Sequence, residues 1–156
     1  MDTSQKEQPQ FSLERLNTDL ILELWSRTYN TSGKQDWSHI FPYYHEDIVF
    51  QDPIQVVSGK DDFLAMCKRL TDRCKELRMD ISSIAASKNE FFLEWTMTMI
   101  FGKTPSTPIF GCTRLTIGTD GRIIRQRDYC DLWGDIFKKV PVMHKIYPKF
   151  MRKLFG

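Results

Sequence analysis

The sequence lacks the segments that export proteins or hold them in membranes. Its first ten residues have neither the basic start nor the apolar run of a secretory signal. No later stretch holds about 18 consecutive apolar residues, the length that a transmembrane helix needs. We therefore expect a cytoplasmic protein, with at most peripheral contact with a membrane.

Cysteine and histidine are scarce, which argues against a metal centre. The four cysteines form no C-x-x-C pair, and no histidine is placed to complete a zinc site with them. We expect the thiols of Cys67, Cys74, Cys112 and Cys130 to be free and buried. The sequence thus predicts no metal and no other cofactor.

Large apolar side chains, by contrast, are abundant. The chain of 156 residues is 41% hydrophobic and 13% aromatic, with 11 Phe and four Trp. This length suits one domain with a substantial core. Side chains of this size fill a core or line a cavity that holds a ring-shaped or acyl ligand.

The formal charge of +2 is unevenly distributed along the chain. Residues 134–156 hold six Lys or Arg against one Asp, a net charge of +5, and the first 133 residues carry −3. A mildly acidic body without a recognised RNA- or DNA-binding motif predicts no nucleic-acid partner.

The chain divides into three segments. We expect residues 1–12 to be disordered, residues 13–133 to form the domain, and residues 134–156 to be a basic, aromatic C-terminal extension. One interpretation places this extension on an anionic membrane surface, with its aromatic rings inserted and its lysines at the headgroups. The alternative is an extension packed over the domain with solvated lysines, since Pro141 and Pro148 break it into short pieces.

The spacing of apolar residues predicts helices in the first half of the chain and strands in the second. We expect an amphipathic helix over residues 13–30, a short helix over 37–44 and a longer helix from about 58 to 77. Strands are predicted over residues 78–86, 91–101, 109–117 and 123–132. The pair Asp120-Gly121 supplies the positive φ of a tight hairpin between the last two strands. Helices followed by a meander predict an α+β fold, in which N-terminal helices wrap a curved antiparallel sheet around an apolar pocket.

Three local patterns carry a family resemblance. They are YHEDIVFQDP at residues 44–53 followed by SGK at 58–60, EWT at 94–96, and DGRI at 120–123 leading to RDY at 127–129. Over residues 13–133 the sequence resembles the nuclear-transport-factor-two-like superfamily, in particular its SnoaL-like polyketide-cyclase and ketosteroid-isomerase branches. The resemblance implies a cone-shaped α+β domain and a homodimer through the outer sheet face. It implies no single reaction, because many activities share this scaffold.

Asp52 is the first candidate catalytic residue. Residues 45–53 alternate as a short strand, which places Ile48, Phe50 and Asp52 on one face. A carboxylate facing an apolar cavity loses water and becomes more basic, which suits proton transfer. The resemblance to ketosteroid isomerases implies that Asp52 is the general base. The alternative is that Asp52 only shapes the turn before Pro53.

Asp128 is the second candidate. Alternation along the last strand places Gln126, Asp128 and Cys130 on the pocket face. The resemblance to polyketide cyclases implies that Asp128 is an acid or base; the alternative is a structural hydrogen bond or salt bridge. Thr113 falls where the isomerases carry an oxyanion-stabilising Asp, and Tyr29 or Trp25 falls near their helix Tyr. The threonine hydroxyl is a weaker donor, so this position departs from the isomerases.

These residues lead to one main hypothesis and one alternative. The main hypothesis is a small enzyme that acts by acid/base chemistry of Asp52 and Asp128 on a lipophilic molecule, such as a polyketide, steroid, terpenoid or fatty-acyl compound. The residues predicted to bind this ligand are Phe50, Trp95, Met97, Thr113, Cys130, Trp25 and Tyr29. The alternative is a non-catalytic binding or assembly module that uses the same pocket or the outer sheet face.

Overall fold

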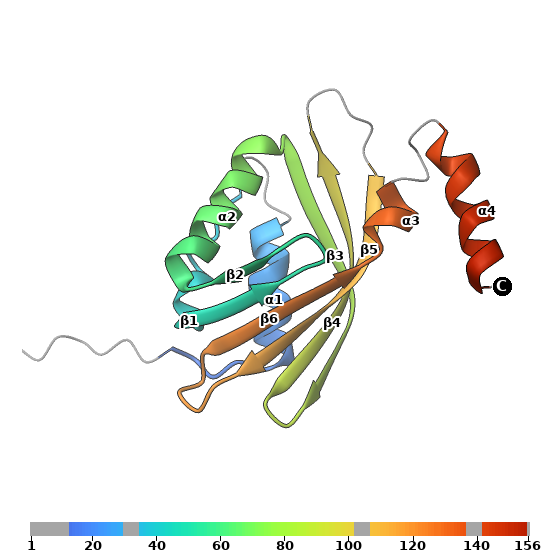
Figure 1. Ribbon diagram of the computed structural model, residues 1–156. Coiled ribbons are helices and arrows are strands. Elements are labelled where there is room, and N and C mark those ends of the chain that lie inside the picture. The colour runs from blue at the N-terminus through green and yellow to red at the C-terminus, as the bar shows by residue number, and fades with distance from the viewer. Residues whose placement is uncertain (1–12, 30–34, 102–106, 137–141, 156) are drawn as a thin grey trace, which may run out of the picture.

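The computed structural model describes residues 13–29, 35–101, 107–136 and 142–155 (Figure 1). The helical elements are α1 (Thr18–Tyr29), the 3₁₀ turn η1 (Phe41–Tyr43), α2 (Lys60–Arg73), α3 (Leu132–Ile136) and α4 (Met143–Phe155). The strands are β1 (Tyr44–Gln51), β2 (Val56–Ser58), β3 (Glu76–Ser87), β4 (Glu90–Ile100), β5 (Thr107–Ile117) and β6 (Ile123–Cys130). The segment predicted to be disordered, residues 1–12, lies outside the described residues.

The six strands form one curved sheet in the order β2-β1-β6-β5-β4-β3 (Figure 1). β3 to β6 follow one another as the antiparallel meander that the sequence predicts. β1 and β6 pair in parallel, so the sheet is mixed, a feature that the sequence pattern did not predict. These strands are far apart in the chain, so no tight hairpin forces them to be antiparallel. α1 packs against β3 and α2 against β1, which confirms the α+β class.

The first helix begins later than its apolar spacing predicts. α1 starts at Thr18 rather than at residue 13. Asn17 is its cap, because Asn17 Oδ1 accepts a hydrogen bond from the Leu20 N–H at 2.9 Å. The predicted end at residue 30 lies outside the described residues.

The next two predicted helices are also shorter in the structure. The helix predicted over residues 37–44 is only the turn η1, whose second residue is Pro42. α2 ends at Arg73, and β3 has begun by the predicted helix end at Leu77. Leu77 is 1% exposed, so it joins the core as a strand residue.

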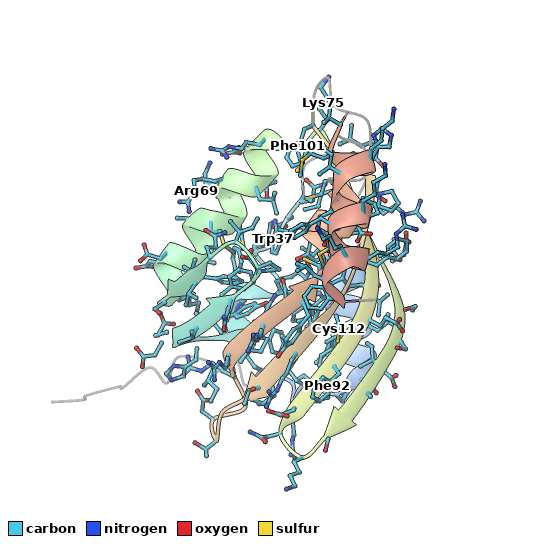
Figure 2. All side chains as sticks on the ribbon, turned by 45° about the vertical axis from the view of Figure 1, so that its right-hand side comes forward. Trp37, Arg69, Lys75, Phe92, Phe101 and Cys112 are labelled. Atoms are coloured by element: carbon cyan, nitrogen blue, oxygen red, sulfur yellow. The ribbon has the colours of Figure 1, made fainter. Side chains whose placement is uncertain are left out.

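The core lies between the helices and the inner face of the sheet. The alternation predicted for β4 and β5 is confirmed, since Leu93, Trp95 and Leu115 are all buried. An aromatic cluster joins the helices to this face through ring pairs 4.8 to 6.4 Å apart. Its members are Trp25, Tyr44, Phe50 and Phe63. A second ring pair, Tyr29 with Trp37, is extended by a hydrogen bond from Trp37 Nε1 to Thr71 of α2. Figure 2 shows Trp37 between α2 and the sheet.

The hairpin between β5 and β6 has the predicted chemistry. Gly121 has a φ of +82°, which a glycine adopts without strain. Asp120 fixes the turn, because its Oδ1 accepts a hydrogen bond from the Arg122 N–H at 3.1 Å and its Oδ2 lies 2.6 Å from Arg122 Nε. The hairpin sets the register that pairs Thr113 of β5 with Asp128 of β6.

The C-terminal helices follow the last strand. In α3, Asp135 Oδ2 accepts a hydrogen bond from the Phe110 N–H at 3.0 Å, which ties α3 to β5 beyond the end of β6. α4 stands apart from the sheet in Figure 1, and none of its residues is buried. No described helix is long and apolar enough to cross a membrane. Part of the predicted extension, residues 137–141 and 156, lies outside the described residues.

Candidate functional site

The candidate site is a hydrogen-bonded chain of side chains centred on Asp128, a partly buried residue of β6. Thr113 Oγ1 donates a hydrogen bond to Asp128 Oδ1 at 2.7 Å, and Trp95 Nε1 donates to Thr113 Oγ1 at 2.9 Å. On the other side, Tyr44 donates from its hydroxyl to Gln126 Oε1 at 2.6 Å. Gln126 Nε2 lies 3.2 Å from Asp128 Oδ1 and 3.4 Å from Oδ2. Four strands, β4, β5, β6 and β1, therefore orient one carboxyl group.

The two carboxylate oxygens of Asp128 differ in their surroundings. Oδ1 accepts from both Thr113 and Gln126. Among the described residues, the hydrogen-bond partner of Oδ2 is Gln126 Nε2, at the limit of hydrogen-bond distance. Oδ2 is thus the oxygen with lone pairs free for a proton of a ligand.

The interior position makes Asp128 unusually basic. Burial raises the pKa of its carboxyl group from 3.8 to about 6. The hydrogen bonds from Thr113 and Gln126 favour the ionised form and oppose this effect, while the negative charge of Asp52 adds to it. Asp128 therefore changes its protonation state close to neutral pH, where a general acid or base is most effective.

A glycine opposite Trp95 makes this geometry possible. Gly111 of β5 pairs with Trp95 of β4, and a Cβ atom on Gly111 would overlap the Trp95 ring. The indole of Trp95 therefore lies against Gly111. Its Nε1 donates a hydrogen bond to Thr113, which is two residues farther along β5. Gly111 is a close-approach glycine, and the alternation of β5 had placed it on the inner face without indicating this role.

Asp52 lies in a different environment, one residue beyond the end of β1. Its Oδ1 accepts hydrogen bonds from the N–H groups of Ile54 and Gln55, both at 2.8 Å. Its own N–H donates to the Gln55 carbonyl at 3.0 Å. These bonds form the turn that the alternative interpretation describes. The catalytic role of Asp52 stays a prediction, although its charge is close enough to raise the pKa of Asp128.

The predicted ligand-binding residues all belong to the inner side of the sheet or to α1. Phe50, Trp25 and Tyr29 are buried in or beside the aromatic cluster, and Met97 and Cys130 are partly buried. Burial raises the pKa of Tyr29 well above its usual value, and nearby Cys67, Tyr44 and Asp128 add to this. The phenol therefore stays neutral at every physiological pH. Whether these residues contact a ligand stays a prediction.

Two further members of the site, Tyr44 and Gln126, were not predicted as site residues. Alternation puts Gln126 on the same face as Asp128, and Tyr44 begins the strand that ends before Asp52. A buried glutamine on an otherwise apolar strand face was the available signal, because a buried amide needs partners. Its partner Tyr44 is 82 residues away, and only the parallel register of β1 and β6 brings the two together.

The thiols and metal-binding groups add no second chemistry to this site. Burial raises the pKa of Cys67 to about 12 and of Cys130 to about 11, with the Asp128 charge as the next cause for both. Both thiols are protonated at neutral pH and are poor nucleophiles. All four cysteines are free, as predicted. Within the described ranges, no group of three or more His, Cys, Asp or Glu could hold a metal ion.

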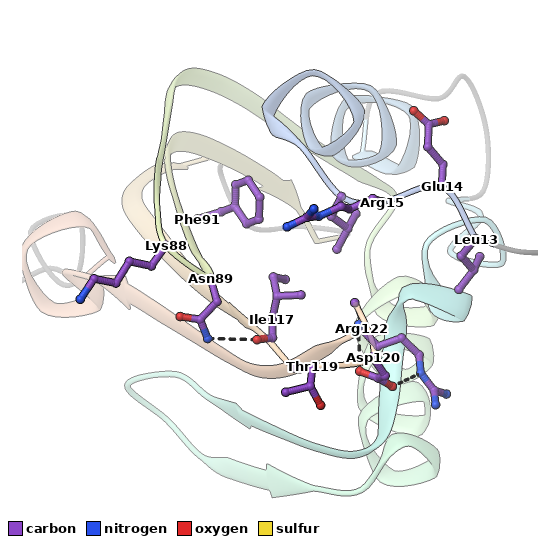
Figure 3. Close-up of a pocket in the computed structure, with 13 residues that line it drawn as sticks. Leu13, Glu14, Arg15, Lys88, Asn89, Phe91, Ile117, Thr119, Asp120 and Arg122 are labelled. Carbon is purple, nitrogen blue, oxygen red and sulfur yellow. Dashed lines mark hydrogen bonds and ion pairs between the residues drawn. The ribbon is translucent and has the colours of Figure 1, made fainter.

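A separate hollow of about 530 Å³ lies at the hairpin end of the sheet (Figure 3). Its apolar wall contains Leu16, Phe91 and Ile117, and the Asp120–Arg122 ion pair lies at its edge. Residues 13 to 16, directly after the undescribed N-terminal segment, form another wall. None of the predicted site residues lines this hollow.

The outer face of the sheet also carries apolar side chains. Phe110 of β5 and Tyr129 of β6 are 58% and 42% exposed. The guanidinium of Arg127 lies over the Tyr129 ring, 4.7 Å from its centroid. The homodimer predicted through this face stays a prediction.

The strand order and the helices over one face give an α+β cone fold like that of solved NTF2-like proteins. The model of the SnoaL-like domain family matches residues 25–126, more than half of the chain. The protein therefore belongs to the SnoaL-like family, which confirms the predicted resemblance. No curated protein matches the chain.

Three solved structures illustrate the range of proteins with this fold. An LEH-like epoxide hydrolase from M. tuberculosis is 21% identical, with a TM-score of 0.61 over 75% of this chain and 86% of that one. An NTF2-like protein of unknown function from Cytophaga hutchinsonii is 17% identical, with a TM-score of 0.58 over 72% and 95%. A protein with a ketosteroid isomerase-like fold from Catenulispora acidiphila, in complex with trimethylamine, is 13% identical, with a TM-score of 0.61 over 72% and 86%. At these identities the likeness shows the fold alone.

Proposed function

We propose that the protein binds a lipophilic small molecule and acts on it by cofactor-free acid/base catalysis, with Asp128 as the general base. The observation that carries the proposal is the interior carboxyl group whose pKa is about 6 and whose Oδ1 is held by Thr113 and Gln126. Such a group is mostly ionised at pH 7 and still accepts a proton readily.

The surroundings of Asp128 suit an apolar substrate with one polar reacting centre. Trp95, Phe50 and Cys130 supply apolar surface, and the carboxyl group is the polar handle on that face. A base in this position can remove a proton beside a carbonyl or activate a water molecule. The names of two structural neighbours, an epoxide hydrolase and a protein with a ketosteroid isomerase-like fold, correspond to these two reaction types. We therefore propose lipophilic epoxides and enolisable ketones as substrate classes.

Incubation of the full-length protein with both substrate classes tests the proposal. One panel contains terpenoid and fatty-acyl epoxides, followed by loss of the epoxide; the other contains unsaturated ketosteroids, followed by the absorbance of the conjugated ketone. We expect turnover of at least one compound by the wild-type protein and its loss in Asp128→Asn, which keeps the shape of the side chain. Equal turnover by wild type and Asp128→Asn would contradict the role of Asp128.

A non-catalytic binding module is the second candidate function, and the environment of Asp52 favours it. The carboxylate of Asp52 is occupied by two backbone N–H groups, so one of the two predicted catalytic aspartates has a structural role in the turn. In a binding module the panel compounds would bind without turnover, and Asp128→Asn would change their affinity but produce no loss of product. Equilibrium dialysis of the panel compounds, run beside the turnover assay, distinguishes the two functions.

A further inference from the structure

α4 separates its side chains into two faces. At the 100° per residue of an α-helix, one face holds the apolar residues and the other the cations. The apolar face consists of Met143, Ile146, Tyr147, Phe150, Met151 and Leu154. The basic face consists of Lys145, Lys149, Arg152 and Lys153.

One half of the apolar face of α4 is exposed to water, whereas Met143, Tyr147 and Met151 are half-buried. Ile146, Phe150 and Leu154, which are one turn apart on this face, are 55%, 56% and 58% exposed. Phe155 at the helix end is 79% exposed, and no residue of α4 is buried. α1, by contrast, buries Ile21, Leu24, Trp25 and Tyr29. An exposed apolar stripe of this kind marks an interaction surface.

The charges of α4 indicate the partner. The helix has four Lys or Arg and no acidic residue, whereas the body of the chain before residue 134 is net negative. The basic face would be repelled by a basic surface and gains nothing from an apolar one, but it complements closely spaced negative charges. Cations on one face and aromatic and aliphatic residues on the other are the features of helices that lie in the membrane interface.

The proline inside α4 is compatible with this arrangement. Pro148 has no N–H to donate to the His144 carbonyl, so the helix lacks one backbone hydrogen bond at this turn. On the helical wheel Pro148 lies outside the apolar face, beside the basic side. Arg152 Nε donates to the Pro148 carbonyl at 3.2 Å on that side. The interrupted stretch of backbone is therefore turned toward the aqueous side when the apolar face is buried.

We propose that α4 docks the protein on an anionic membrane by lying flat in the lipid headgroup region. Ile146, Phe150 and Leu154 enter the boundary with the acyl chains, while Lys149 and Lys153 extend to the headgroups. The helix has 13 residues and is about 20 Å long, so it lies on the surface and does not span the bilayer. Docking of this kind places the domain where lipophilic molecules are concentrated, but it does not depend on the proposed catalysis.

Co-sedimentation of the full-length protein with vesicles tests the proposal. Vesicles of phosphatidylcholine alone are compared with vesicles containing phosphatidylserine, each at low and high salt. We expect binding to the anionic vesicles that weakens as salt rises. Ile146→Ser/Phe150→Ser/Leu154→Ser should abolish binding, and Lys149→Gln/Lys153→Gln should reduce the partition coefficient roughly 30-fold, on the order of five-fold per cation.

Matched variants outside α4 control for general loss of charge or apolar surface. Arg69→Gln/Lys75→Gln removes two exposed cations, and Ile54→Ser removes a side chain that is 73% exposed. Both controls should bind as wild type, and circular dichroism should show that every variant is folded. Equal binding by the α4 variants and wild type would overturn the proposal. So would a wild-type dimer that the triple serine variant converts to a monomer, because a second copy would then cover the apolar face.

Discussion

Asp52 and Asp128 were both predicted to face the pocket, yet their surroundings differ. Asp52 directly follows the last residue of β1. Its carboxylate accepts hydrogen bonds from the backbone N–H groups of Ile54 and Gln55. Asp128 lies within β6, where the backbone is paired with β5 and the side chain points into the interior. There its carboxylate accepts hydrogen bonds from the side chains of Thr113 and Gln126. The Asp52 carboxylate is thus bound by backbone, whereas the Asp128 carboxylate, which points to the buried face of its strand, is desolvated and becomes more basic.

The largest expected difference between the two aspartates is in turnover. Asp128→Asn removes the base and should lower kcat/KM by roughly 10²–10⁴-fold. Asp52→Asn keeps an acceptor for the turn and should lower kcat/KM by less than about tenfold, since general-base catalysis remains. Steady-state kinetics of both variants on the same substrate measure this ratio. Equal losses would show that the two carboxylates act as a pair, as the sequence predicted.

Asp128→Asn should lower turnover but raise the stability of the folded protein. The pKa of Asp128 is raised on folding, so the folded state binds the extra proton, and stability from this group falls as pH rises from about 4 to above 6. Asp128→Asn avoids the cost of an ionised interior carboxylate. It should raise the free energy of unfolding by up to about 3 kcal/mol at pH 8 and by little at pH 4. Urea unfolding at both pH values measures the gain, and a gain independent of pH would refute this explanation.

The next effect concerns Thr113, which links Trp95 to Asp128. Thr113→Val removes the acceptor of the buried Trp95 N–H and should destabilise the fold by about 1–3 kcal/mol. It also removes a donor to the carboxylate, so the pKa of Asp128 should rise and the pH profile of kcat/KM should shift upward. Thr113→Ser keeps the hydroxyl group and is the control. Unfolding and pH profiles that are the same for the two variants would show that the hydroxyl is not needed.

The smallest effect is the electrostatic one between the two aspartates. The charge of Asp52 raises the pKa of Asp128, so Asp52→Asn should lower this pKa. The rise of kcat/KM with pH, which requires ionised Asp128, should then occur at lower pH than in the wild-type protein. Asp47→Asn, which removes an exposed carboxylate of β1, is the control and should leave the profile unchanged. An unshifted profile for Asp52→Asn would mean that solvent screens the interaction.

Strand periodicity predicted the buried positions Leu93, Trp95, Thr113 and Leu115, because successive side chains of a strand point to opposite faces of the sheet. The same rule predicted that Asp52 faces the pocket, but β1 ends at Gln51, so the alternation of the strand does not extend to Asp52 and its predicted role stays a prediction. The prediction that α2 ends at Leu77 was wrong for a related reason. Leu70, Cys74 and Leu77 continue a helical spacing, although Leu77 begins the alternation of β3.

Other features depend on contacts that no local pattern encodes. The parallel pairing of β1 with β6 brings Tyr44 to Gln126, two residues 82 positions apart. The need for Gly111 depends on the ring of Trp95 on the neighbouring strand. Asp128 was predicted as a site residue. The hydrogen bonds that orient its carboxyl group depend on the register of four strands, which the sequence pattern does not give.

The central claim, that Asp128 is a desolvated general base, is tested most directly by its own titration. Carbon-13 NMR of the aspartate carboxyl carbons, assigned with Asp128→Asn, reports the midpoint for this residue. The structure predicts a pKa of about 6 for Asp128. A midpoint near the ordinary aspartate value of about 3.9 would contradict the claim and favour a structural role for this carboxylate.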